Sequence, residues 1–347
     1  MIMKKTTFDV GQLVQVRTKE EILATLDANG RLDGLPFMPE MLKFCGRQFR
    51  IAKRAHKTCD TVFPVRGRRM ADAVHLETRC EGDAHGGCEA GCLIFWKNAW
   101  LQEAGADTRA SQSTAVVTSG GARGGCAEED VFRNARRADV TDGEPAYVCQ
   151  ATQLPYATSA LSHWNLSQYV EDYTSGNVSL GKLVSGLGFA SYRFLINLGI
   201  GLGVPLRWLY DAFQRLRNGV PYPLREGKLP LGAATPTTVL NVQPGELVRV
   251  KSYDAILATC DKALRNRGMS FDKEMVPYCG GVFRVQKRVN RIVDEKTGKM
   301  LQMKNPCVVL DGAYCKSQYS ECRLFCPRSI YCYWREIWLE RVESLPK

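Results

Sequence analysis

Residues 11–54 read GQLVQVRTKEEILATLDANGRLDGLPFMPEMLKFCGRQFRIAKR, and a second stretch of the chain repeats much of this pattern. Residues 245–288 read GELVRVKSYDAILATCDKALRNRGMSFDKEMVPYCGGVFRVQKR, which aligns with the first stretch at a constant offset of 234 and without a gap. Of the 44 aligned positions, 20 are identical, whereas unrelated segments of ordinary composition share about three. We therefore predict an internal duplication.

The similarity returns later in both copies, around paired tryptophans. Residues 92–101, CLIFWKNAWL, align with residues 332–339, CYWREIWL, so that the two tryptophans of each copy correspond. Within a copy these tryptophans are four residues apart, which predicts one face of a helix packed in the core. The predicted domains are a first module at 8–104, a flexible linker at 105–145, a helical insertion at 146–240 and a second module at 241–344.

Each module opens with Gly-x-Leu-Val-x-Val, followed by a basic residue and Ser or Thr. The alternation of apolar and polar residues predicts a strand with one buried face. An amphipathic stretch of about two helical turns follows at 20–27 and at 254–261. In the second module we predict strands at 282–293, 300–303 and 307–310, with a turn at 295–298.

The opening of each module resembles that of SH3-like barrels, including the KOW type of ribosomal and transcription proteins. The resemblance covers about thirty residues per copy and implies a small barrel of short, twisted strands. SH3-like barrels bind RNA, peptides or other proteins, or act as enzyme subunits, so the resemblance implies a fold class only. The predicted class is α+β: two homologous, small, SH3-like, Cys-rich β-barrel-like modules with a largely helical insertion between them.

Four cysteines occur in the same order in each module. They are Cys45, Cys80, Cys88 and Cys92 in the first copy, and Cys279, Cys315, Cys322 and Cys326 in the second. Four thiolates suit a closed tetrahedral zinc site or an iron–sulfur cluster, and a metal would pin the loop-rich second half of each module. The spacing lacks the paired Cys-x2-Cys of zinc ribbons, so buried apolar cysteines and disulfide or redox chemistry remain alternatives.

Further ligand-type residues concentrate in the first module. It adds His56, Cys59, His75 and His85, whereas the second adds Cys307 and Cys332. Histidine is a common metal ligand and the usual proton carrier near neutral pH. We expect Cys80, Cys88 and Cys92 to bind zinc with His75 or Cys45 as the fourth ligand, with surface or packing histidines as the alternative.

A glutamate also recurs at aligned positions, Glu40 and Glu274. A carboxylate beside thiols can act as a general base. Two arginines recur as well, at positions 50 and 54 of the first copy. We therefore expect the glutamates to form salt bridges with these arginines.

The bulk composition is that of a folded, basic protein. The chain has 347 residues, 45% of them hydrophobic, and a formal net charge of +11. This length allows two or three domains, and the charge favours an acidic partner such as nucleic acid, anionic lipid or an acidic protein. A solvated basic surface is the alternative, because no Lys/Arg run reaches the length of a nucleic-acid patch.

Two features bear on location. Residues 1–16 lack the apolar core of a secretory signal, and the longest apolar stretch, residues 194–206, is shorter than the about 20 residues of a spanning helix. We therefore expect a cytoplasmic protein. Residues 180–217 predict two helices with an apolar stripe at Leu206, Leu209, Tyr210, Phe213 and Leu216. This pair fits peripheral contact with an anionic membrane, with packing on the modules or a dimer contact as alternatives.

Recognised catalytic motifs, including the phosphate loop and the nucleophile elbow, do not occur in the sequence. We therefore favour a metal-stabilised, zinc-containing duplicated binding or scaffold protein that recognises an acidic partner. One alternative is a metal- or thiol-dependent enzyme, such as an iron–sulfur redox enzyme, with its site in the first module. Another is a nucleic-acid binder.

Overall fold

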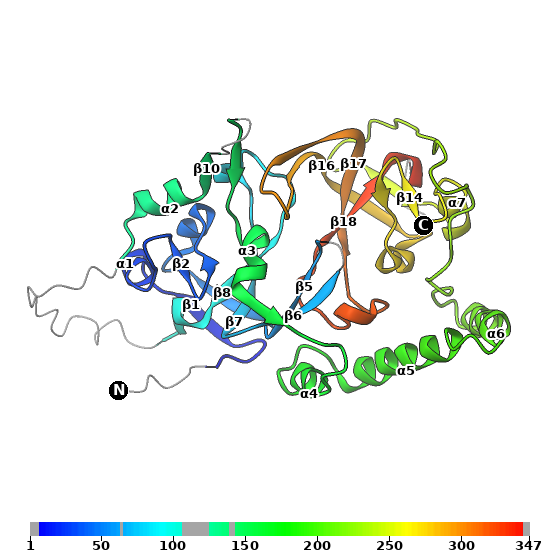
Figure 1. Ribbon diagram of the computed structural model, residues 1–347, viewed down its shortest axis with the longest axis horizontal. Helices are drawn as coiled ribbons and strands as arrows, with labels where there is room; N and C mark the ends of the chain where they lie inside the picture. The colour runs from blue at the N-terminus through cyan, green and yellow to red at the C-terminus, as the bar shows by residue number, and fades with distance from the viewer. Residues whose placement is uncertain (1–6, 63–64, 106–124, 139–142, 343–347) are drawn as a thin grey trace, which may run out of the picture. The chain divides into compact units, whose positions relative to one another are not determined.

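The computed structural model describes residues 7–62, 65–105, 125–138 and 143–342 (Figure 1). The protein is mixed α+β with mostly antiparallel sheets, which confirms the α+β part of the predicted class. The chain divides into two compact units, Met1–Val178 with Val293–Leu301, and Ser179–Ile292 with Gln302–Lys347. The predicted insertion at 146–240 is therefore shared between the units, with the division after Val178.

A five-stranded antiparallel sheet with the order β8-β7-β4-β1-β9 forms the base of the first unit. Its strands are β1 (Leu13–Val16), β4 (Gln48–Arg54), β7 (Ala73–Arg79), β8 (Leu93–Lys97) and β9 (Leu101–Glu103). In β1 the alternation has the predicted effect, because Val14 and Val16 are fully buried while Leu13 is exposed. Val14 pairs with Phe49 on one side and with Glu103 on the other.

The second unit has a five-stranded sheet with the corresponding order, β18-β17-β16-β13-β19. Its strands are β13 (Leu247–Val250), β16 (Val282–Val293), β17 (Met300–Tyr314), β18 (Tyr331–Arg335) and β19 (Leu339–Arg341). Val248 pairs with Phe283, which repeats the Val14–Phe49 pair at the offset seen in the sequence. The two sheets thus share strand order and register at the aligned positions. Strand β16 has the predicted bounds, whereas the two strands predicted at 300–303 and 307–310 are one strand.

The two tryptophans of the first copy do not lie on one common helix, contrary to the prediction. Trp96 lies on β8, and Trp100 ends the 3-10 helix η3 (Asn98–Trp100). A spacing of four fits a helix, but here a strand followed by one tight turn brings both rings into the core. Both are fully buried, and the edge of Phe37 contacts each, with centroid distances of 6.4 and 5.3 Å. Core packing, the other half of that prediction, is confirmed.

The first unit also contains short elements around its sheet. A three-stranded sheet consists of β5 (Lys57–Asp60), β6 (Arg66–Met70) and β12 (Thr158–Ala160). One two-stranded sheet pairs β2 (Arg31–Leu32) with β3 (Leu35–Pro36). Another pairs β10 (Arg136–Ala138) with β11 (Pro145–Tyr147). The helices are α1 (Lys19–Leu23), η1 (Pro39–Phe44), η2 (Asp83–His85), α2 (Glu128–Asn134), α3 (Gln150–Ala157) and α4 (Ser167–Thr174). Helix α2 and strand β10 lie within the predicted linker, of which residues 106–124 and 139–142 are outside the described residues. Val131 of α2 is buried in the core.

The second unit adds fewer elements to its sheet. Strands β14 (Arg265–Asn266) and β15 (Met269–Ser270) pair with each other. The helices are α5 (Leu180–Ile196), α6 (Gly203–Leu216), α7 (Tyr253–Leu257), η5 (Lys273–Tyr278), η6 (Glu321–Arg323) and η7 (Glu336–Trp338). Thus η5 and α7 occupy the positions that η1 and α1 occupy in the first copy.

Candidate metal centre

One group of metal-ligand side chains converges among the residues that the structure describes. It consists of Glu40, Cys80 and His85, whose ligand atoms all lie within 4.8 Å of one another. Glu40 lies on η1, Cys80 follows strand β7, and His85 ends η2. Glu40 and His85 are buried and Cys80 is partly buried. These three residues are the candidate metal centre.

The loop that carries Cys80 and His85 depends on a glycine. Gly82 has a φ of +80°, and a Cβ at this position would overlap the carbonyl oxygen of Cys88. Only glycine meets both conditions without strain. Gly82 therefore lets the chain turn directly after Cys80, which brings His85 back toward Glu40.

Hydrogen bonds fix the protonation of His85 in the structure. The Nε2 atom of His85 lies 3.1 Å from the carbonyl oxygen of Val148, and Nδ1 lies 2.7 Å from Oε1 of Glu40. Because a carbonyl oxygen only accepts, Nε2 carries a proton. Oε1 also accepts from the backbone N–H of Ala84 at 3.1 Å, whereas the buried Oε2 atom of Glu40 has no hydrogen-bond partner among the described residues.

The charges around the group favour a cation. Burial raises the pKa of Glu40, but the hydrogen bond and positive charge of His85 outweigh burial, so this pKa lies below its ordinary value of 4.5. The pKa of the Cys80 thiol is raised, first by burial and then by the negative charges of Glu40, Cys92 and Cys149. A thiolate at Cys80 therefore needs a nearby cation, and a divalent metal supplies one.

The donor set suits zinc, which binds sulfur, imidazole nitrogen and carboxylate oxygen. A metal at this position would replace the proton between Nδ1 of His85 and Glu40, and Oε2 of Glu40 would become available as a further donor. The Nε2–H bond to Val148 would remain, and ligating histidines usually make such a bond with their second nitrogen. The three residues would supply three ligands, and Oε2 of Glu40 would be a fourth donor atom.

The other ligands predicted in the first module do not join this group among the described residues. The pKa of Cys45 is raised to about 11, first by burial and then by the negative charge of Glu20 on α1. Nδ1 of His75 lies 2.9 Å from the carbonyl oxygen of Ile94. The Sγ atom of Cys88 accepts the backbone N–H of Val293 at 3.3 Å within the first unit. Of the predicted set Cys45, His75, Cys80, Cys88 and Cys92, only Cys80 belongs to the candidate metal centre.

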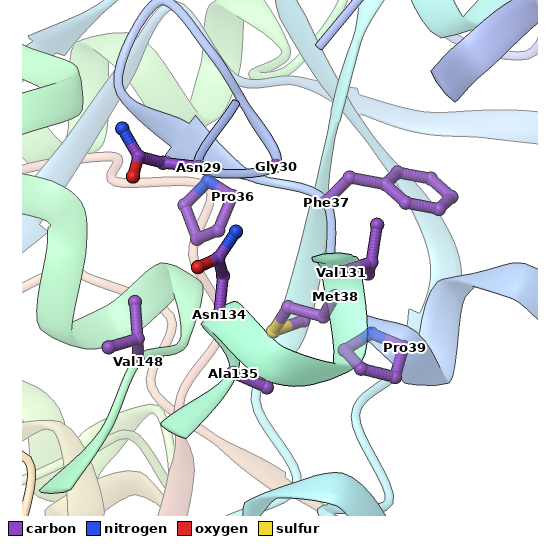
Figure 2. A pocket seen from close by; sticks show the side chains of 10 residues that line it. All are labelled: Asn29, Gly30, Pro36, Phe37, Met38, Pro39, Val131, Asn134, Ala135 and Val148. Atoms are coloured by element: carbon purple, nitrogen blue, oxygen red, sulfur yellow. The ribbon is translucent and has the colours of Figure 1, made fainter. Parts of the chain in front are cut away.

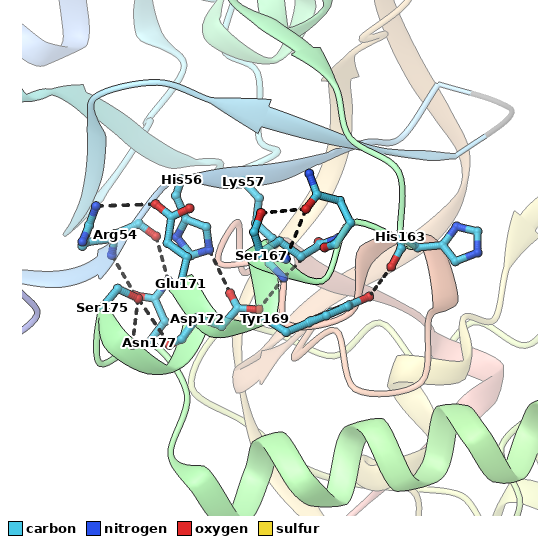
Figure 3. Close-up of polar contacts among 12 residues, drawn as sticks. Arg54, His56, Lys57, His163, Ser167, Tyr169, Glu171, Asp172, Ser175 and Asn177 are labelled. Carbon is cyan, nitrogen blue, oxygen red and sulfur yellow. Dashed lines mark hydrogen bonds and ion pairs between the residues drawn. The ribbon is translucent and has the colours of Figure 1, made fainter.

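Two further candidates, His56 and Cys59, lie on another side of the first unit. Figure 3 shows His56 and Lys57 facing Asp172 of α4, with His56 Nε2 2.9 Å and Lys57 Nζ 2.5 Å from its carboxylate oxygens. All three residues are buried, and Cys59 is buried on strand β5. The opposite charges of Lys57 and Asp172 pair with each other in the interior, so this cluster attaches α4 to the rest of the first unit.

The second copy has the same carboxylate in different surroundings. Glu274 accepts the backbone N–H groups of Gln318 at 2.8 Å and Tyr319 at 2.7 Å, and the hydroxyl of Ser320 at 3.0 Å. The Gln318 bond repeats the Ala84 bond at the offset of 234, so Tyr319 stands where the first copy has His85. Burial raises the pKa of Glu274 above 4.5, and the backbone hydrogen bonds do not fully offset it.

The predicted cysteines of the second copy form no comparable group among the described residues. Burial raises the pKa of Cys279 to about 12 and that of Cys332 well above its ordinary value. Cys307 donates to the carbonyl oxygen of Val289 at 3.4 Å, and Cys315 lies 3.3 Å from the Ser317 hydroxyl. Cys322 lies on η6 and Cys326 is buried.

The fourth cysteines of the two copies are not equivalent. The backbone N–H of Cys80 bonds to the carbonyl oxygen of Cys92 at 2.9 Å, and that of Cys315 bonds to Ile330 at 2.7 Å. Ile330 therefore occupies the position of Cys92, and Cys326 belongs to the preceding loop. The order of cysteines recurs in the sequence, but the complete set does not recur in space.

Sequence reasoning assigned Glu40 to the wrong partner. Arg50 donates to the carbonyl oxygen of Gly11 at 3.0 Å, and Arg284 donates to the equivalent Gly245 at 2.6 Å, so neither bonds to the recurring glutamates. The usable signal was the recurrence of Glu40 itself. Val148, which accepts from His85, lies outside both repeats and carried no signal.

A small pocket is lined partly by residues that precede Glu40 in the chain (Figure 2). Its lining includes Met38 and Pro39, together with Val148 and Val131 of α2. None of the three candidate ligands lines it. Its cavity volume is about 10 Å³, far below the roughly 300–1,000 Å³ of pockets for drug-sized ligands, so it is too small to be such a site.

Comparison of the chain with protein-family models, with curated proteins and with solved structures finds no match. The function is therefore inferred from the residues and geometry of the site.

Proposed function

We propose that this chain is a metal-stabilised binding protein in which the first copy holds one zinc ion through Glu40, Cys80 and His85. The observation that carries this proposal is the convergence of three different zinc-ligand types within 4.8 Å. The buried Oε2 atom of Glu40, which has no hydrogen-bond partner in the part of the chain that the structure describes, supports it. The second copy has the same sheet order but Tyr319 in place of His85, and we propose that it binds no metal.

The proposed role of the metal is to stabilise the fold. Zinc would connect η1, through Glu40, with the loop that carries Cys80 and His85. His85 in turn donates to Val148, which precedes helix α3. One ion would thus tie together three segments that the chain brings in from distant positions, and its binding free energy would add to that of folding.

The site favours a structural metal over a catalytic one. Glu40 and His85 are buried, and neither lines the small pocket. An iron–sulfur cluster is held mainly by several cysteine thiolates, whereas the ligand group found among the described residues contains one thiol. We therefore retain zinc and a binding role over the enzyme alternative.

Two further parts of the proposal concern origin and partner. We propose that the two copies arose by duplication of an SH3-like module, which the 20 identities in 44 positions and the shared strand order support. The net charge of +11 supports an acidic partner, because long-range attraction concentrates ligands of opposite charge.

Elemental analysis of matched cysteine variants tests the metal proposal. The variants are Cys80→Ser and Cys315→Ser, which occupy corresponding positions in the two copies. After zinc loading and gel filtration, we expect one zinc per chain in the unchanged protein and in Cys315→Ser, and none in folded Cys80→Ser. An unchanged protein without zinc, or zinc retained by Cys80→Ser, would contradict the proposal.

A further inference from the structure

Helices α5 and α6 and the connection between them present many apolar side chains to solvent. Phe194, Ile200, Val204, Trp208, Phe213 and Leu216 are all at least half exposed, and Leu216 reaches 88%. Side chains of this size are scattered singly on an ordinary surface, and their concentration on one element marks an interaction site. This set, with residues 197–202 of the connection, is called the apolar helix surface.

The exposure does not come from helices that lack anchoring. Gly186 of α5 lies so close to Phe325 that a Cβ would overlap its ring. Phe189 packs against Tyr319 with ring centroids 5.0 Å apart, and the Tyr192 hydroxyl donates to the carbonyl oxygen of Leu206 at 2.6 Å. The inner sides of both helices are therefore fixed within the second unit, and the apolar helix surface is their remaining outer side.

The predicted apolar stripe of α6 is divided between these two sides. Tyr210 points inward and packs on Tyr222 of the second unit, with ring centroids 5.6 Å apart. Leu209, Phe213 and Leu216 are 55%, 50% and 88% exposed. Packing on the module thus accounts for Tyr210 but leaves the rest of the stripe uncovered.

The charge of this region is strongly positive. Residues 180–217 contain five basic side chains, Lys182, Arg193, Arg207, Arg215 and Arg217, and one acidic side chain, Asp211, giving 5 − 1 = +4. The carboxylate of Asp211 lies 2.6 Å from Arg225, so its charge is already compensated. Arg207, Arg215 and Arg217 are exposed close to the apolar side chains. A second copy of the same surface would place like charges together, whereas an anionic lipid surface complements them.

We propose that the apolar helix surface binds the interface of an anionic lipid bilayer. The exposed side chains of α6 and of the connection would enter the interface, and the arginines would contact lipid phosphates. None of the helices described has the length and apolar character of a membrane span, so the helices would lie along the surface. Trp208, which is 69% exposed, suits this position because its ring is apolar with one polar edge.

Vesicle flotation of the full chain tests this inference. The vesicles are phosphatidylcholine with and without phosphatidylserine. We expect flotation with phosphatidylserine vesicles and little without them. The double variant Val204→Ser, Trp208→Ser should lose binding by at least about tenfold, because both apolar side chains would be buried in the lipid interface. Both positions are exposed, so the variant should retain the circular dichroism of the unchanged protein.

Two controls separate the outcomes. Leu231→Ser, also in the second unit and 72% exposed, should bind as the unchanged protein does. Cys80→Ser should bind equally well, because the inference does not rest on the metal. Absence of flotation of the folded protein with phosphatidylserine vesicles would overturn the proposal. Concentration-dependent self-association that the double variant abolishes would overturn it as well, by assigning the surface to a second copy.

Discussion

The two copies have sheets of the same strand order and a buried glutamate at the same aligned position, but the two glutamates have different partners. Glu40 bonds to His85, and Glu274 bonds to the backbone of Gln318 and Tyr319. The pKa of Glu40 is lowered by His85, whereas burial raises that of Glu274. The partner of the glutamate thus differs: it is the His85 side chain in the first copy and the backbone around Tyr319 in the second. Two sheets of the same strand order can therefore surround a buried carboxylate with different chemistry.

The copies also differ in the contact that attaches a neighbouring helix to each of them. In the first unit, Asp172 of α4 meets His56 and Lys57 through buried charge. In the second unit, Tyr319 meets Phe189 of α5 through ring packing. The chemistry at each docking point therefore predicts different responses to substitution.

The largest effect is expected from removing the carboxylate charge of the first copy. In metal-free buffer, Glu40→Gln should lower the free energy of unfolding by about 3–5 kcal/mol, because it breaks the buried pair that Glu40 forms with His85. Glu274→Gln should cost about 1 kcal/mol, since an amide oxygen still accepts the backbone N–H bonds. Urea unfolding measures both, and equal losses would remove the proposed difference between the copies.

The second effect concerns the attachment of α4. Asp172→Asn should cost about 3 kcal/mol, because the buried ammonium of Lys57 would then face an uncharged amide. Glu171→Gln on the same helix is the control. Its ion pairs with Arg54 and Arg69 are more exposed, at 23% for the glutamate side chain, and should contribute about 1 kcal/mol or less. If thermal and urea unfolding give the two variants the same stability, the buried cluster does not hold the helix.

The third effect is stabilisation by zinc. At a free zinc concentration of about 100 times the dissociation constant, the free energy of unfolding should rise by about 2.7 kcal/mol. Calorimetry should show this rise for the unchanged protein and for Cys315→Ser, but not for Cys80→Ser. A rise of similar size in Cys80→Ser would place the metal elsewhere.

The smallest effect is a pH dependence that belongs to the second copy. The pKa of Glu274 in the folded chain is above 4.5 because of burial. Its contribution to stability is therefore fully present below the unfolded pKa and is lost as pH rises through the raised folded value, by about 1.4 kcal/mol per pKa unit. The stability of the unchanged protein relative to Glu274→Gln should thus decrease from about pH 4 to pH 7. Parallel stability curves for the two proteins would show that Glu274 does not titrate in this way.

Local patterns in the sequence were sufficient to predict most of the framework. Alternation identified strands β1 and β13, and the bounds of β16 were predicted correctly. The two helices predicted at 180–217 correspond to α5 and α6. The Trp96–Trp100 spacing failed because a spacing of four fits a helix and also a strand that ends in a 3-10 turn.

The candidate metal centre was only partly predictable. Cys80 and His85 were selected for their chemistry, but cysteine spacing pointed to Cys88 and Cys92 as further ligands. Glu40, which lies on η1 and bonds to His85, was not predicted to join them, because residue spacing does not encode the fold that brings η1 to the turn at Gly82. Recurrence showed that Glu40 and Glu274 matter to the fold, but the partner of each is set by a loop residue that differs between the copies.

Cobalt titration followed by absorbance tests the central claim most directly, because cobalt substitutes for zinc and reports a bound thiolate as a charge-transfer band. For the unchanged protein we predict one equivalent of cobalt per chain, with a thiolate band that Cys80→Ser abolishes and Cys315→Ser retains. Two equivalents, or a band that persists in Cys80→Ser and disappears in Cys315→Ser, would contradict a single metal centre in the first copy.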